Sequence, residues 1–294
     1  MLIDKVKGIT SRKVVDQVMK MLKVKRAGHF GSLDPFATGL LCIGLGQGTK
    51  LLPFMHAQQK EYIATIGFDM TTDTDDITGA VLEKYDVTAI DVGKANQWFM
   101  ENRGWVNQVP PRYCAQKYQG KPLYKLTRAN IDVQPREKQV YIEDVEVLTV
   151  GPDWMDVRIV CSRGTYIRSI ARDLGSFLGT GGYLRELRRL RSEGFHVEDA
   201  ISIENLANKN DNGIDVVIPL LKALHIPKSR VIPSGQKGIL EGNPIQASWI
   251  MDEVEVDQGN YVAMTSIEDQ LLCIARYEPS GGIWGYIERG FHPD

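Results

Sequence analysis

A change in sequence character between residues 208 and 233 most constrains the fold of this chain. Before it, helical and strand periodicities alternate; after it, short β-type runs separated by Gly, Asn and Asp remain. The break is marked by an Asn-rich run at 208–213 and by Pro219, Pro227 and Pro233. We predict two domains, an α+β domain over 1–225 and a compact all-β domain over 226–294.

Several segments of the first domain carry strand patterns. Residues 40–46 form an apolar run ended by glycines, which is typical of a buried strand. Residues 60–70 and 155–161 alternate between two faces, so we expect strands there as well. Tyr62 therefore lies on a strand, and a strand tyrosine is more often packing than catalytic.

Helical spacing predicts two helices. One follows Ser11, a candidate N-cap, and the other follows Thr165, which can cap it in the same way. Arg168 falls in the first turn of the second helix, where a cation is unfavourable unless a carboxylate lies nearby. Four arginines follow and are expected on a basic helix face, either solvated or bound to RNA: Arg185, Arg188, Arg189 and Arg191.

The charge distribution permits a nucleic-acid partner although the net charge is -2. Residues 1–61 hold ten Lys and Arg against four Asp and Glu, whereas residues 211–294 hold six against twelve. Because phosphate contacts depend on local basic surface, this asymmetry allows a basic face on an acidic protein.

Three glycines surround Asp34 and Pro35 in the stretch 28–39. Glycine permits turns that other residues disfavour, and the turn would hold the Asp34 carboxylate at a fixed point. Taken alone, an Asp before Pro is more often a turn residue than a functional one.

Cations and aromatic residues interleave over 104–130, including Arg112, Tyr113 and Lys117. This composition suits unstacked bases of an RNA loop better than a duplex, since cations meet phosphates and rings meet base faces. The acidic run 71–79 lacks the Gly and Glu spacing of a calcium-binding loop, so we predict no metal there.

The remaining composition indicates a cytoplasmic protein. Four cysteines lie far apart without metal or redox spacing, and the first residues do not resemble a signal peptide. No apolar run approaches the roughly 20 residues that cross a bilayer, so we expect no membrane association.

Several of these stretches, in this order, resemble motifs of the tRNA pseudouridine-55 synthases, the TruB family. The motifs lie at 28–39, 60–62, 72–76, 108–113, 123–124 and 161–168. Departures from the family pattern are Val6 for Pro, Phe30 for Thr and Cys114 for Ser.

This resemblance implies a pseudouridine-synthase fold, with a mixed, largely antiparallel sheet flanked by helices and loops. It also implies a thumb-like RNA-binding insertion over about 104–135 and a C-terminal PUA-like RNA-binding domain. The implied activity is cofactor-free isomerisation of uridine 55 in the T-loop of tRNA, after the base is flipped out.

The resemblance also assigns roles to individual residues. Asp34 matches the essential aspartate, Tyr62 the tyrosine that stacks on the target base, and Arg168 the arginine that pairs with the aspartate. Further substrate-binding residues are His29, Tyr166, Leu187, Lys5, Arg112 and Lys117.

Two alternatives to a synthase that acts on the tRNA T-arm without a protein partner remain open. One is a related synthase that works inside a guide-RNA particle. The other is a non-catalytic protein that binds or folds tRNA. The presence of Asp34, Tyr62 and Arg168 favours an enzyme over pure binding.

Overall fold

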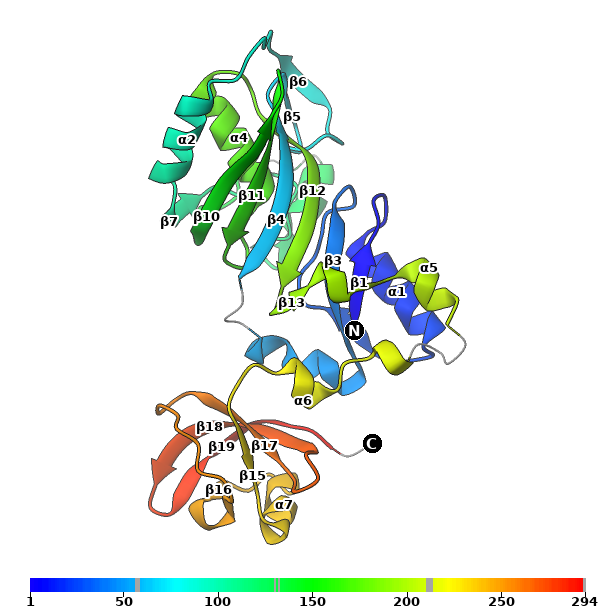
Figure 1. Ribbon diagram of the computed structural model, residues 1–294, viewed down its shortest axis with the longest axis vertical. Coiled ribbons are helices and arrows are strands. Elements are labelled where there is room, and N and C mark those ends of the chain that lie inside the picture. The colour runs from blue at the N-terminus through cyan, green and yellow to red at the C-terminus, as the bar shows by residue number, and fades with distance from the viewer. Residues whose placement is uncertain (56–58, 130, 132, 210–213, 293–294) are drawn as a thin grey trace.

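The computed structural model describes residues 1–55, 59–129, 131, 133–209 and 214–292. A larger α+β body contains the N-terminus, and a smaller β-rich body follows a connector that includes α6 (Leu220–Ala223) (Figure 1). The predicted fold class is therefore confirmed.

One sheet of ten described strands organises the larger body. In sheet order, its main path is β14 (Ile201–Ser202), β1 (Leu2–Lys5), β3 (Thr38–Leu45), β12 (Tyr183–Ser192), β4 (Lys60–Gly67), β11 (Trp154–Cys161), β10 (Lys138–Val150) and β7 (Gly104–Gln108). β2 (Ala27–His29) pairs with β3, and β13 (Phe195–His196) pairs with β12. Only the β1–β14 and β3–β12 pairs are parallel, so the sheet is mixed and largely antiparallel, as predicted.

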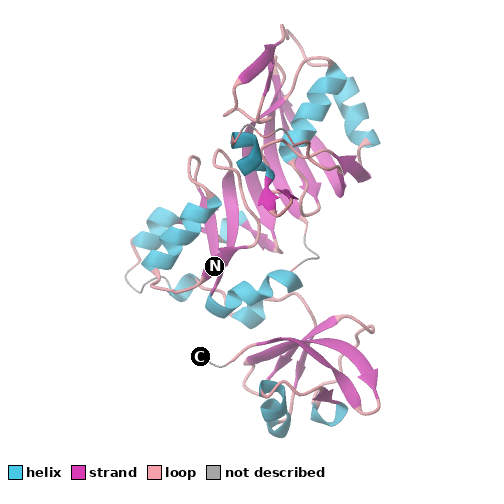
Figure 2. Cartoon of the chain, turned by 180° about the vertical axis from the view of Figure 1, so that it is seen from behind, coloured by secondary structure: helices cyan, strands magenta, loops and turns pink. Residues whose placement is uncertain are grey.

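Helices cover the sheet at both of its ends. α2 (Val92–Glu101) and α4 (Ile167–Leu178) lie beside β10, β11 and β4, whereas α1 (Ser11–Met21) and α5 (Ile203–Ala207) lie beside β1 and β3 (Figures 1 and 2). The apolar face of α4 packs on β4 and β11 because its buried positions recur at helical spacing. This packing fixes the N-terminal end of α4, where Arg168 lies.

Short elements complete the larger body. Two hairpins are formed by β5 (Met70–Thr72) with β6 (Val81–Lys84) and by β8 (Lys117–Tyr118) with β9 (Lys121–Pro122). The helical ones are α3 (Leu123–Arg128), η1 (Gly46–Phe54), η2 (Val197–Asp199) and η3 (Ile214–Val216).

The smaller body is a five-stranded sheet with its own core. Its strands, in sheet order, are β15 (Lys228–Arg230), β17 (Tyr261–Thr265), β18 (Leu271–Ser280), β19 (Ile283–Gly290) and β16 (Ile245–Gln246), accompanied by α7 (Pro233–Leu240) and η4 (Ala247–Trp249). The two bodies touch through η1: the Phe54 ring meets the Tyr261 ring edge-on, and Lys50 Nζ donates to the Gly290 carbonyl at 3.0 Å.

Three local predictions are wrong. Thr10, not Ser11, caps α1, because its hydroxyl accepts from the Lys13 amide. Tyr166, not Thr165, occupies the N-cap of α4 and provides no side-chain cap. The four arginines expected on a helix face lie on strand β12.

Some predictions fall partly outside the described residues. These are the break at 208–213, of which 210–213 are not described, and the insertion at 104–135, of which 130 and 132 are not. In the described part of the chain, no helix has both the length and the apolar character needed to cross a membrane.

Candidate active site

The Asp34 loop joins β2 to β3 and is anchored at several points. Ser11 Oγ accepts from the Leu33 amide at 2.8 Å and donates to the Leu33 carbonyl at 3.0 Å. The Pro35 carbonyl accepts from the Gly8 amide at 2.7 Å. Both neighbours of Asp34 are thus held to the N-terminal segment.

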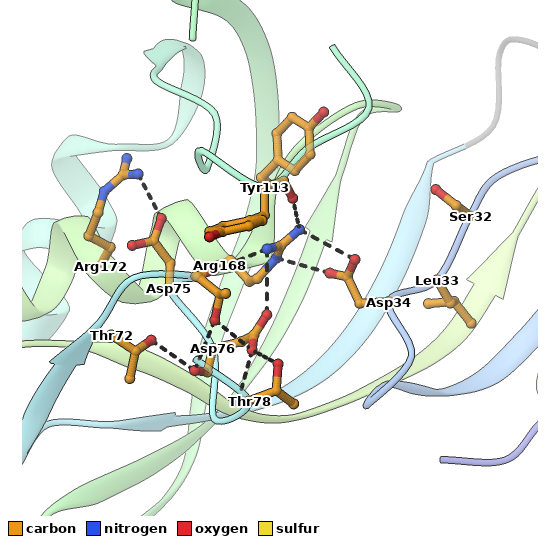
Figure 3. A network of polar contacts seen from close by, with 12 residues as sticks. Ser32, Leu33, Asp34, Thr72, Asp75, Asp76, Thr78, Tyr113, Arg168 and Arg172 are labelled. Atoms are coloured by element: carbon orange, nitrogen blue, oxygen red, sulfur yellow. Dashed lines mark hydrogen bonds and ion pairs between the residues drawn. The ribbon is translucent and has the colours of Figure 1, made fainter. Parts of the chain in front are cut away.

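Arg168 forms an ion pair with Asp34, the residue that it was predicted to contact. Its Nε lies 3.0 Å from Asp34 Oδ2, and its Nη2 lies 3.3 Å from Asp34 Oδ1 (Figure 3). The predicted pairing is confirmed, and it explains how a cation is tolerated in the first turn of α4. The Arg168 side chain is 6% exposed, whereas that of Asp34 is 37% exposed, so the carboxylate is the more accessible of the two to a ligand.

The same guanidinium has three further acceptors. It donates to the Thr74 carbonyl at 3.0 Å and to the Tyr113 carbonyl at 3.1 Å, and it lies 3.5 Å from Asp76 Oδ2. Arg168 therefore ties the Asp34 loop to the 73–79 loop and to the 104–135 segment.

Asp76 is a site residue that sequence reasoning missed. Its Oδ1 accepts from the hydroxyls of Thr74 and Thr78 and from the Thr78 amide, at 2.6–2.9 Å (Figure 3). Its side chain is 6% exposed. The signal was present in the Thr-Asp run at 72–76, which resembles a family motif but received no role for any of its residues.

Burial and the neighbouring cations have opposite effects on the pKa of Asp34. Burial raises the pKa of the Asp34 carboxyl and Asp76 adds to the rise, while Arg168 and then Lys5 oppose it. The net pKa lies above the ordinary value for Asp. Arg168 thus limits a rise that burial would otherwise make larger.

Asp34 opens into a pocket of about 250 Å³. Tyr62, Leu187, Tyr166 and Arg168 line it, so the structure brings together five of the nine predicted site residues. Tyr62 is buried, which raises the pKa of its phenol to about 12. The ring is therefore neutral at physiological pH and offers a flat apolar face.

Tyr166 is held from two sides. Its amide donates to Gln108 Oε1 at 2.8 Å, and its carbonyl accepts from Gln108 Nε2 at 3.1 Å. The Lys138 ammonium lies 4.7 Å from the Tyr166 ring centroid, a cation–π contact. These contacts fix the wall of the pocket that faces the segment 104–135.

His29 lines a wider groove of about 890 Å³ that adjoins the pocket and shares Asp34 with it. Burial lowers the pKa of His29, and the cations of Arg189, Lys60 and Arg12 lower it further. At neutral pH the imidazole is therefore uncharged, as suits contact with bases rather than phosphates.

The other three predicted residues do not line the pocket. Lys5 is 1% exposed, and its ammonium donates to the carbonyls of Val6, Ile9 and Pro35 at 2.9–3.3 Å. Lys5 thus supports the Asp34 loop through the Pro35 carbonyl and does not face a ligand. Arg112 and Lys117 are exposed in the 104–135 segment. Among the described residues, no three His, Cys, Asp or Glu side chains gather as a metal site requires.

Comparison with known families covers most of the chain. The model of the TruB family pseudouridylate synthase N-terminal domain matches residues 19–167, and that of the tRNA pseudouridylate synthase B C-terminal domain matches residues 168–224. Proteins named tRNA pseudouridine synthase B are similar. The one from Syntrophotalea carbinolica is 34% identical over 95% of this chain and 92% of its own, and the one from Syntrophus aciditrophicus is 40% identical over 76% and 72%.

Solved structures are similar over nearly the whole chain. A Cbf5–Nop10–Gar1 complex contains a chain that superimposes with a TM-score of 0.75 at 26% identity, over 99% of this chain and 85% of that one. A chain in an H/ACA ribonucleoprotein bound to substrate RNA superimposes with a TM-score of 0.74 at 24% identity, over 99% and 85%. The latter likeness concerns the fold alone.

Proposed function

Because this chain belongs to the TruB family of pseudouridylate synthases, we propose that it isomerises uridine to pseudouridine at position 55 of tRNA. The observation that carries the proposal is the partly exposed Asp34 carboxylate, paired with a buried arginine at a pocket walled by Tyr62 and Leu187. One end of such a pocket is charged and the other is apolar, as a flipped nucleoside requires.

The reaction places few demands on the protein. The C1′–N1 bond of uridine breaks, the detached uracil turns, and C5 bonds to C1′. The C5 hydrogen then leaves as a proton and N1 gains a proton, so the product is an isomer of uridine. No electrons are gained or lost overall and no group is transferred to another molecule. Asp34 and the pocket therefore suffice in principle, and we propose that no cofactor takes part.

Each pocket residue has a defined part in this proposal. Ionised Asp34 acts on the sugar, either by attack at C1′ or by assisting elimination across C1′–C2′. Arg168 keeps Asp34 ionised and oriented, since an adjacent cation favours the charged carboxylate. The Tyr62 ring stacks on the uracil while Leu187 and Tyr166 close the pocket, so the turning base stays inside.

The surroundings of the pocket suit a flipped T-loop. In the proposal, His29 contacts bases displaced by flipping, and the groove that it lines receives the loop. Exposed Arg112 and Lys117 meet phosphates as the 104–135 segment closes on the RNA. We place the catalytic domain at 1–225 and assign RNA binding to a PUA-like domain at 226–294.

The test is pseudouridine mapping at position 55 of an unmodified tRNA transcript with purified protein alone. We expect modification by the wild type and none by Asp34→Asn, which keeps the shape of the side chain but removes its charge. Asp86→Asn is a matched control, because Asp86 is exposed in the loop before α2. Modification by Asp34→Asn would refute the role of Asp34.

The likeness to a chain in the Cbf5–Nop10–Gar1 complex supports a second candidate, a synthase that depends on guide RNA and partner proteins. Greater identity to proteins named tRNA pseudouridine synthase B, 34–40% against 26%, favours action without them. If the wild type alone binds tRNA but leaves uridine 55 unchanged, the second candidate takes precedence.

A further inference from the structure

A second arginine, Arg189, also holds the Asp34 loop. It contacts the backbone on either side of Asp34 rather than the Asp34 carboxylate. Arg189 is 1% exposed, yet its guanidinium carries a full charge. Its Nε donates to the Leu40 carbonyl at 2.7 Å, its Nη2 to Gly31 at 3.0 Å and its Nη1 to Ser32 at 3.3 Å. These carbonyls lie before and after Asp34 in the chain.

The backbone of Arg189 also contacts the loop. Arg189 and Gly39 are register partners where β12 and β3 run parallel. Gly39 has φ +100°, and a Cβ there would collide with the Arg189 carbonyl, so only glycine allows this approach. One residue of β12 thus meets both ends of the catalytic loop.

The charge of Arg189 belongs to a buried cluster that we define as Lys60, Arg189 and Glu193. Glu193 is fully buried, and Lys60 Nζ lies 3.7 Å from its Oε1. Neither carboxylate oxygen accepts a hydrogen bond from the described residues. Burial raises the pKa of Glu193, while Lys60, Arg163 and Arg189 oppose the rise, so the cations limit the cost of burying this carboxyl group.

The backbone conformation of the turn that carries Glu193 does not require a glutamate. Glu193 and Gly194 both have positive φ, 55° and 81°, in the connection between β12 and β13. Two-residue turns of this kind favour Asn or Gly in the first position. The carboxylate, rather than the backbone, therefore accounts for glutamate at this position.

We propose that Arg189 is a positioning residue that fixes the Asp34 loop in its reactive geometry, within a buried cluster whose carboxylate, Glu193, lies beside Lys60. The inference rests on the proposed function. Arg189 does not itself line the pocket that Asp34 opens into; it acts through the carbonyls of Gly31, Ser32 and Leu40. Its charge and a side-chain hydrogen bond also oppose the rise in the pKa of Tyr62, which does line the pocket. The planar fork of arginine serves three acceptors at once, which a lysine ammonium at the end of a flexible stem does not reproduce.

The test is single-turnover release of tritium from C5 of labelled uridine in a tRNA transcript, with enzyme in saturating excess. The variants are Arg189→Met, Arg189→Lys and Glu193→Gln, the last of which removes the buried carboxylate beside Lys60 but leaves the three carbonyl contacts of Arg189 in place. Arg185→Met is the control, since Arg185 is exposed on the same strand. Melting temperature and tRNA affinity are measured in parallel.

Displacing Asp34 by about 1 Å should lower the rate about 100-fold. We expect this loss in both Arg189 variants, with tRNA affinity within twofold of wild type and Arg185→Met at the wild-type rate. Glu193→Gln should lower the melting temperature, because Lys60 loses its buried partner, but should leave the rate at the wild-type value. That split separates positioning from simple stabilisation of the fold.

Several outcomes would overturn the inference. A rate loss in Glu193→Gln equal to that in Arg189→Met would mean that Arg189 only stabilises the fold, and a wild-type rate in Arg189→Lys would mean that charge alone matters. If a variant is unstable, amide hydrogen exchange distinguishes a local effect from general unfolding. The inference requires that the amides of residues 30–40 lose protection while those of β17 to β19 keep theirs. No release by the wild type would instead refute the proposed function, and this inference with it.

Discussion

Replacing Arg168 by Met tests the electrostatic account of the site, because it removes one cation and keeps an unbranched apolar side chain. Arg168 serves the carboxylates of Asp34 and Asp76 and the carbonyls of Thr74 and Tyr113. Removing one partner of a buried ion pair costs about 3–5 kcal/mol, since the other charge is left without compensation.

The structure sets the expected cost at the lower end of this range. Asp76 is 6% exposed and loses its cation, but it keeps three hydrogen bonds from Thr74 and Thr78. Asp34 is 37% exposed, so water screens much of its loss. We expect a loss of about 3 kcal/mol, or about 6–12 °C in melting temperature for a chain of this size.

The rate of Arg168→Met should also change its dependence on pH. Arg168 is the strongest influence that lowers the pKa of Asp34, so its removal raises that pKa further. In the proposed reaction Asp34 acts only when it is ionised, so the acid limb of the pH–rate profile should move to higher pH. Tritium release under single-turnover conditions, followed across the acid range, measures this shift.

Arg172→Met provides the control for this experiment. Arg172 lies one turn further along α4 and pairs with Asp75, at 2.9 Å, rather than with Asp34. Its loss should lower stability and leave the acid limb in place. An unmoved acid limb in Arg168→Met, with tRNA still bound, would refute the proposal that Arg168 keeps Asp34 ionised.

Two further predictions concern Asp34 and the basic surface. Because the folded-state pKa of Asp34 lies above its unfolded value, its charge costs stability once the pH exceeds the unfolded pKa. Asp34→Asn should therefore match or exceed the wild-type melting temperature at neutral pH, and calorimetry should show the difference shrinking toward about pH 4. Lys117→Gln should reduce the slope of log affinity for tRNA against log salt by about 1, whereas Lys94→Gln on α2 should not; an unchanged slope for Lys117→Gln would place that residue away from the RNA.

Periodicity predicted elements correctly where each element keeps one regular pattern. Strands β4 and β11 alternate between buried and partly exposed faces over most of their length, and α4 repeats its apolar positions at helical spacing. Strand β12 breaks this rule. Register irregularities between Leu184 and Glu186, and between Arg189 and Arg191, shift its alternation twice, so its arginines lie at spacings that favour a helix.

The candidate site could be predicted only in part for a different reason. Asp34 and Arg168 are 134 positions apart, and no local pattern indicates that their loops meet. Resemblance to a family supplied that pairing, but it gave no role to Asp76 or Arg189. Charged residues are usually exposed to solvent, so the sequence alone gives no sign that these two are buried. The tertiary structure shows that they are.

The two buried arginines support the Asp34 carboxylate in different ways. Arg168 contacts Asp34 directly and governs its charge, while Arg189 contacts the backbone of the loop and governs its position. This division suits a reaction in which the base must leave the RNA stack before chemistry begins, since binding energy is then spent on flipping. A loop anchored on both sides of Asp34 before RNA arrives requires no further ordering at that moment. The buried charges are thus best explained by preorganisation of the site, because paired buried charges contribute little net stability to a fold.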